Sequence, residues 1–234
     1  MKSLSTLVLA LLAAPAVLPA QTPWPIGCPV PVTVANNGTT PLPYQPCTPV
    51  VTDAQGNFVS IGLCLQVLIM MPPGAAETMY WNQTDSTGQQ VAPGLYFVNG
   101  QPFVIGGADM AVEPLGAPHV GYTRNVEVCA ADQAGQPYIL AASFSSLAGI
   151  SLGCGRVFPL DPDPLLDASL SSPSVFSDFV GLLDQYGRAT APAITLPPLP
   201  WLVGLPIELA ALTLDGSQPC GIGAISPPRA VTIE

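Results

Sequence analysis

The chain has 234 residues, of which 49% are hydrophobic and only 9% are charged, and its formal net charge is −10. Binding to nucleic acid or to anionic lipid needs clustered lysine and arginine side chains, so five basic residues among fifteen acidic ones argue against both partners. The acids are scattered along the chain, which leaves Ser, Thr, Asn, Gln and Pro to form most of the polar surface.

The chain begins with MKSLSTLVLALLAAPAVLPAQ, which has the parts of a secretory signal peptide. Lys2 is the positive region, and Leu4 to Ala14 is an apolar stretch too short to span a bilayer comfortably. Cleavage could follow Ala20, but cleavage after Ala16 fits the small-residue rule better. We therefore expect residues 1–20 to be a signal peptide, and the mature chain to be secreted or to lie in the cell envelope.

Six cysteines follow the expected cleavage site, and an even number in an exported chain predicts disulfides. They are Cys28, Cys47, Cys64, Cys129, Cys154 and Cys220. The sequence does not determine the pairing; as working pairs we take Cys28 with Cys47, Cys154 with Cys220, and Cys64 with Cys129. No C-x-x-C pair is present, which argues against a redox motif or a zinc knuckle.

Short β-branched or alternating apolar segments recur between 29 prolines and 22 glycines. This pattern of short apolar segments separated by proline and glycine predicts strands rather than helices. The candidate strands are residues 31–34, 65–70, 95–98, 125–128, 193–196 and 230–233. Residues 174–185 could form a helix, but we prefer a strand over 177–183 because a hairpin turn follows it.

The pattern D-x-x-G occurs four times, at residues 53–56, 85–88, 132–135 and 184–187. An Asp that begins a type I turn accepts backbone N–H bonds, and the Gly at the fourth position supplies a positive φ. Each copy lies between apolar or alternating segments, so we interpret all four as hairpin turns rather than as calcium-binding or catalytic acids.

We therefore predict an all-β protein of two antiparallel, immunoglobulin-like β-sandwich modules with disulfides. The modules would cover residues 21–112 and 122–234, with a linker over 113–121 where Pro and Gly interrupt the pattern. Residues 194–214 are strongly apolar, but four prolines would break a membrane-spanning helix. We expect a proline-rich connection that leads into a strand, and no membrane insertion of the mature chain.

The segment from Trp81 to Val98 is the most distinctive in the chain. Trp81 precedes the turn at Asp85 and Gly88, and Pro93, Gly94, Leu95 and Tyr96 begin the return strand. The order resembles the final hairpin of the bacterial intracellular proteinase inhibitor family, and it is similar to that of the immunoglobulin-like domain of flagellar hook-capping proteins. The resemblance covers about residues 30–105 and implies peptidase inhibition as one activity. We expect Trp81 to be buried and to pair with Tyr96 across the hairpin, on one face of one sheet.

The second half of the chain, about residues 120–234, resembles an uncharacterised β-rich domain of secreted proteins from environmental bacteria. The matching patterns lie at residues 152–160, 181–189, 194–205 and 231–233. This resemblance implies export and β architecture, and no activity.

Residues for catalysis or metal binding are sparse. His119 is the single histidine, and no serine lies in a G-x-S-x-G elbow. Asp161, Asp163 and Asp167 form the one acidic cluster; they could contribute to a Ca²⁺ site, although the prolines between them suggest an extended turn. We predict no catalytic residue, no cofactor and no metal site.

Three functions follow as hypotheses. The first is a non-enzymatic protein that binds an unidentified protein or glycan partner at the cell surface or acts as an adhesive or structural module. The second is a secreted peptidase inhibitor, and the third is a hydrolase.

Overall fold

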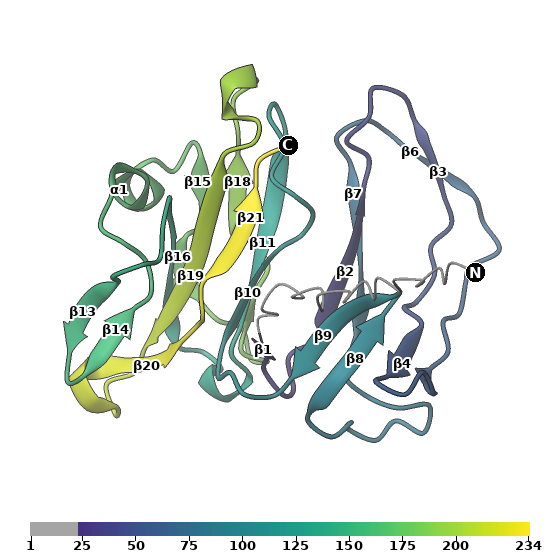
Figure 1. The fold of residues 1–234 in the computed structure, drawn as a ribbon, viewed down its shortest axis with the longest axis horizontal. Coiled ribbons are helices and arrows are strands. Elements are labelled where there is room, and N and C mark those ends of the chain that lie inside the picture. The colour runs from purple at the N-terminus through teal and green to yellow at the C-terminus, as the bar shows by residue number, and fades with distance from the viewer. Residues whose placement is uncertain (1–22) are drawn as a thin grey trace, which may run out of the picture.

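The computed structural model describes residues 23–234, so the expected signal peptide lies outside the described residues. Within this range the chain forms strands β1 to β21, one short α-helix and three 3₁₀ turns. The predicted all-β class is confirmed. Figure 1 shows two lobes side by side, with β1 to β9 in one lobe and β10 to β21 in the other.

Module 1 is the lobe built from the first nine strands, which frame one small core. The strands are β1 (Pro23–Trp24), β2 (Val30–Ala35), β3 (Leu42–Tyr44), β4 (Val51–Asp53), β5 (Phe58–Ser60), β6 (Ile69–Met71), β7 (Ala76–Trp81), β8 (Gly94–Val98) and β9 (Gln101–Ile105). Five of them form a sheet in the order β1-β9-β8-β4-β5, while β2 pairs with β7 and β3 with β6. Trp24, Val51, Trp81 and Val98 are buried together in this core.

Module 2 is a sandwich of two sheets. Its strands are β10 (Ala111–Pro114), β11 (Thr123–Cys129), β12 (Pro137–Ser143), β13 (Ile150–Gly153), β14 (Arg156–Phe158), β15 (Phe176–Ser177), β16 (Val180–Leu182), β17 (Arg188–Ala189), β18 (Ala193–Thr195), β19 (Pro206–Leu214), β20 (Ile222–Ile225) and β21 (Arg229–Thr232). One sheet has the order β10-β11-β18-β15, with β17 beside β11; the other has the order β16-β12-β19-β20, with β21 beside β19. The remaining two strands, β13 and β14, pair with each other in a separate hairpin. The largest core cluster, which includes Val126, Leu140 and Leu209, draws on both sheets.

Most predicted strands lie where strands form, but two segments differ. The 65–70 segment is a strand only from Ile69 onward, and its first residues are exposed loop. The preferred strand over 177–183 is observed as two short strands, β15 and β16, and no helix forms there. Residues 194–214 run through a 3₁₀ turn (Pro200–Leu202) into the long strand β19, as predicted. Among residues 23–234 no helix is long and apolar enough to cross a membrane.

The acidic cluster begins a helix, so the expected extended turn is wrong. Helix α1 spans Pro164–Ser171, and the Asp163 carboxylate accepts hydrogen bonds from the N–H groups of Leu165 and Leu166 at 2.9 Å. Proline at the first helical position has no N–H group to leave unpaired, so Pro164 favours this start rather than preventing it. Figure 1 shows α1 on the outer side of module 2, where Leu166 packs with Phe158.

The connection between the modules lies earlier than the expected linker at 113–121. Glu113 and Pro114 belong to β10, which pairs antiparallel with β11 from Ala111 to Pro114. β10 is an edge strand, where a proline can be accommodated because one side of the strand needs no donor. The segment that joins β9 to β10 is residues 106–110.

Three of the four D-x-x-G segments are Asp-headed hairpin turns. The carboxylates of Asp53, Asp85 and Asp184 each accept backbone N–H bonds from the residues two and four positions later. The fourth copy differs, because Asp132 lies inside a 3₁₀ turn (Ala131–Gln133) with no side-chain cap. All four glycines have a positive φ, between 73° and 84°.

Two of these turn glycines should respond very differently to alanine. Gly88 has a φ of 84° with open space around it, so Gly88→Ala should cost only the backbone strain, about 1–2 kcal/mol. Gly187 also has a positive φ, but an added Cβ would overlap the carbonyl oxygen of Ala130. Because backbone must then shift, Gly187→Ala should cost about 3 kcal/mol or more. Urea unfolding of both variants measures this difference, and equal losses would contradict it.

All six cysteines form disulfides in the structure, but two of the three working pairs are wrong. The observed bonds are Cys28–Cys129, Cys47–Cys64 and Cys154–Cys220, so the last of these is confirmed. Cys28–Cys129 joins the two modules, and both residues are fully buried in the module 1 core. Cys47 and Cys64 face each other in a short antiparallel bridge, with their Cα atoms 3.9 Å apart.

Candidate binding surface

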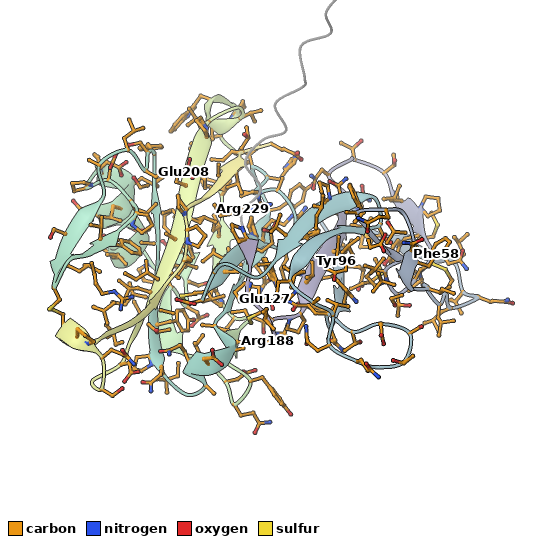
Figure 2. The ribbon with its side chains drawn as sticks, turned by 60° about the horizontal axis from the view of Figure 1, so that its bottom comes forward. Phe58, Tyr96, Glu127, Arg188, Glu208 and Arg229 are labelled. Atoms are coloured by element: carbon orange, nitrogen blue, oxygen red, sulfur yellow. A yellow bond between two sulfur atoms is a disulfide. The ribbon has the colours of Figure 1, made fainter. Side chains whose placement is uncertain are left out.

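A run of exposed apolar side chains is the most unusual surface feature of module 1. Within residues 58–70, seven large apolar side chains are more than half exposed; these are Phe58, Ile61, Leu63, Leu65, Val67, Leu68 and Met70. We call residues 58–70 the apolar segment. Large exposed apolar side chains are common singly, whereas seven within thirteen residues are unusual on the surface of a soluble protein. Figure 2 shows Phe58 at the far end of module 1, away from module 2.

The apolar segment is held in place by a disulfide and a short backbone ladder. The N–H groups of Thr48 and Leu65 donate to the carbonyl oxygens of Leu63 and Pro46, at 2.8 and 2.9 Å. Because side chains alternate along an extended chain, Leu63 and Leu65 point to the face opposite the Cys64 disulfide. The chain therefore presents these apolar groups on a fixed backbone.

The hairpin residues predicted from Trp81 to Tyr96 lie in two sheets rather than one. Trp81 is only 4% exposed, and its ring centroid lies 5.3 Å from that of Tyr96. However, Trp81 lies in β7, which pairs with β2, whereas Tyr96 lies in β8, which pairs with β4 and β9. The two rings thus meet between facing sheets, and the expectation of one shared sheet face is wrong.

The remaining residues of this hairpin stabilise its turn and begin its return strand. Asp85 accepts the turn N–H groups and the Thr87 hydroxyl, and hydrogen bonding to that hydroxyl and to the Gln89 and Thr87 N–H groups lowers the pKa of its carboxyl. Gly88 closes the turn at positive φ, and Gly94 begins β8. Nothing in this arrangement collects groups that could act on a substrate.

Two of the three carboxylates of the acidic cluster, those of Asp161 and Asp163, are hydrogen-bonded within the protein. Asp161 accepts hydrogen bonds from the Ser145 hydroxyl and from the N–H groups of Leu147, Ala148 and Gly149. Asp163 caps α1 and also binds Ser143, while Asp167 is exposed on the helix. The hydrogen bonds from Ser145 and the loop amides lower the pKa of Asp161 far below its ordinary value. Asp161 therefore organises the 145–149 loop, and Asp163 organises the start of the helix.

His119 is not part of a catalytic group among the described residues. Its Nδ1 lies 2.9 Å from the carbonyl oxygen of Val120, and its ring packs against Tyr122 with centroids 5.0 Å apart. No serine hydroxyl or carboxylate is hydrogen-bonded to it within residues 23–234. The Ser-His-Asp chemistry that a hydrolase of that class needs is therefore not assembled around this ring.

A buried ion pair that the sequence did not indicate lies where the modules meet. Arg188 and Glu127 are 2.9 Å apart, and Glu127 is fully buried. The guanidinium of Arg188 also lies 4.7 Å from the ring centroid of Tyr80, which belongs to module 1. Burial raises the pKa of Glu127, and the nearby Arg188 opposes this; burial and Glu127 raise the pKa of Tyr80 to about 12. Because Glu127 is fully buried, the Arg188–Glu127 ion pair is a structural contact rather than a substrate site. Figure 2 labels both residues, which lie close together.

Every arginine of the described chain is engaged internally. Arg188 and Arg229 pair with Glu127 and Glu113. Arg156 donates to the carbonyl oxygens of Ile222 and Gly223, and Arg124 donates to Gly74 and Asn37. Residues 23–110 contain no lysine or arginine at all. The surface therefore offers acids and apolar groups, and no free cation among residues 23–234.

No known family model matches this chain, and no curated protein matches it.

Proposed function

We propose that this protein is exported and acts without catalysis, by binding a protein partner outside the cytoplasm through its apolar segment. The observation that carries the proposal is the exposure of seven large apolar side chains on a disulfide-held backbone. Three disulfides fit an oxidising compartment, and the sequence of residues 1–20 fits a signal peptide. We further propose that both modules are immunoglobulin-like.

The chemistry of the segment favours a protein over the other partner classes. Large aliphatic side chains bury best against complementary apolar surface, whereas glycans need many hydrogen-bonding groups. Anionic lipid would be repelled, because module 1 carries acids such as Asp53 and Glu77 and no cation. A partner with an apolar groove satisfies both constraints.

Binding to intact cells of the source organism tests this proposal. Leu63 is 77% exposed, so Leu63→Ser and Leu68→Ser together should leave folding intact while removing much of the apolar surface. We expect the labelled double variant to bind cells at least about a hundredfold more weakly, because two large apolar contacts contribute about 3 kcal/mol or more.

A matched control uses apolar side chains of similar exposure in module 2. Val180 and Leu182 lie on β16, and Leu182 is 68% exposed. The Val180→Ser, Leu182→Ser variant should bind cells as the unmodified protein does. If both double variants bind equally well, the apolar segment is not the binding surface and the proposal fails.

Peptidase inhibition is the second candidate, and one observation favours it. The apolar segment is extended, exposed and held by Cys47–Cys64, which are features that let an inhibitor loop occupy a peptidase cleft without being ordered first. Incubation with a panel of peptidases would separate the two functions. Stoichiometric inhibition that the Leu63→Ser, Leu68→Ser variant loses would favour the inhibitor.

A further inference from the structure

A cleft of about 520 Å³ opens where the edges of the two modules meet. Its walls come from β2 and β9 of module 1 and from β10 and β21 of module 2. This volume lies in the range of small-ligand and side-chain sites. Figure 2 shows Arg229, which lines the cleft, on the side of module 2 near module 1. The cleft shares no residue with the apolar segment.

The charged lining of the cleft has an excess of carboxylate. Arg229 pairs with one oxygen of Glu113 at 2.8 Å, and the other Glu113 oxygen accepts no hydrogen bond from residues 23–234. Glu234 also lines the cleft and accepts one hydrogen bond, from Asn37 at 2.6 Å. The lining thus contains two carboxylates and one guanidinium, while a second guanidinium, that of Arg124, interacts with Glu234 from outside the lining. The cleft retains acceptor capacity for a cation.

The rest of the lining is apolar and poor in free donors. Pro31, Pro102 and Pro114 have no N–H group, and the Thr33 hydroxyl is already bonded to Thr78 at 2.8 Å. Phe103 adds an aromatic wall, and Trp24 packs against it edge-on with centroids 6.3 Å apart. Such a site suits a ligand with an apolar stem and a charged, donating head.

We propose that the cleft binds a basic side chain, arginine or lysine, presented by a partner polypeptide. Its methylene stem would lie along the prolines and Phe103, and its N–H groups would donate to Glu113 and Glu234. A guanidinium or ammonium supplies several donors and no acceptor, which matches the unused carboxylate oxygens.

A second copy of this chain cannot supply that side chain from the described residues. The four arginines of residues 23–234 are engaged internally, and this range contains no lysine. No basic side chain of the described residues is therefore free to fill the cleft, and charge complementarity identifies the chemistry of the ligand.

The cleft is formed before a ligand arrives. The Cys28–Cys129 disulfide joins the two modules, and Arg124 of β11 donates to the Asn37 side chain and to the Gly74 carbonyl of module 1. Asn37 in turn contacts Glu234, which lines the cleft. Because these contacts fix the relative position of the walls, binding need not order them.

A capped pentapeptide titration tests the inference with the intact mature protein. The probe is acetyl-Ala-Ala-Arg-Ala-Ala-amide, and the matched neutral probe replaces arginine with citrulline, which has nearly the same shape. Amide NMR shifts should change at Gln101, Gly116 and Thr232 with the arginine peptide. The citrulline peptide should bind about tenfold or more weakly, because it lacks the charge-assisted hydrogen bonds.

Variants of the cleft carboxylates test whether these groups bind the arginine side chain of the peptide. Glu113→Gln and the exposed Glu234→Gln should each weaken the arginine peptide, whereas Glu208→Gln, on β19 and outside the cleft lining, should not. Because Glu234→Gln changes an exposed side chain, it keeps the test valid even if Glu113→Gln fails to fold. Equal binding of the arginine and citrulline peptides, shifts confined to other residues, or tighter binding of an Ala-Ala-Glu-Ala-Ala peptide would each overturn the proposal.

Discussion

Trp81→Ala should lower the free energy of unfolding by about 3–5 kcal/mol. The indole is 4% exposed, packs on Tyr96 with centroids 5.3 Å apart, and donates its N–H to the Thr84 carbonyl at 2.9 Å. Removal would leave a cavity between the two facing layers of module 1 and an unpaired carbonyl at the turn. Chemical denaturation followed by circular dichroism measures the loss.

Trp201 provides the matched control for this experiment. It lies in the 3₁₀ turn of module 2 and is 67% exposed, so Trp201→Ala should change stability by less than about 0.5 kcal/mol. A Trp81→Ala protein as stable as the Trp201→Ala protein would mean that Trp81 is not the centre of the module 1 core.

Loss of the Cys28–Cys129 bond should be the most damaging of the three disulfide removals. It closes a loop of 101 residues, for which the chain-entropy relation gives about 4.7 kcal/mol. Both cysteines are also fully buried in the module 1 core, so the double alanine variant loses packing as well. Thermal unfolding of the Cys28→Ala, Cys129→Ala protein measures the effect.

The Cys47–Cys64 bond gives a direct comparison. It closes a separation of only 17 residues and lies at an exposed site, so its removal should cost about 3 kcal/mol. If the Cys47→Ala, Cys64→Ala protein were the less stable of the two double variants, module docking would contribute less to the fold than the structure indicates.

Local features of the fold could be predicted because they depend on a few neighbouring residues. The alternating apolar segments predicted five strands at nearly their observed positions, namely β2, β8, β11, β18 and β21. The hairpin turns at Asp53, Asp85 and Asp184 follow from one carboxylate that accepts nearby N–H groups. These are interactions over two to four residues, which a sequence pattern records directly.

Contacts between distant segments could not be predicted in this way. The Trp81 hairpin crosses between sheets because buried Gln83 adopts a φ of 57° and bonds to Pro25 and Gly27. A glutamine carries no sequence signal for that conformation. Similarly, the positions of Cys28 and Cys129 in the sequence do not predict that they form a disulfide, because the two residues meet only after both modules have folded.

The candidate surfaces were the least predictable part of the molecule. Residues 65–70 alternate like a half-buried strand, and only the structure shows that Leu65, Val67 and Leu68 face solvent. The cleft combines Glu113 and Arg229, which are more than one hundred residues apart in the chain and meet at the open edges of two sheets. A pattern of hydrophobic residues in one strand does not specify which other strand packs on it, and so it does not predict which faces and edges stay exposed.

Disulfide mapping of the purified exported protein tests most directly that the two modules are locked into one binding unit. Pepsin digestion at low pH under non-reducing conditions, followed by mass spectrometry, identifies the linked peptides without thiol exchange. The structure predicts three linked pairs, Cys28–Cys129, Cys47–Cys64 and Cys154–Cys220. A peptide that joins Cys28 to Cys47, or a free thiol at Cys129, would contradict the account.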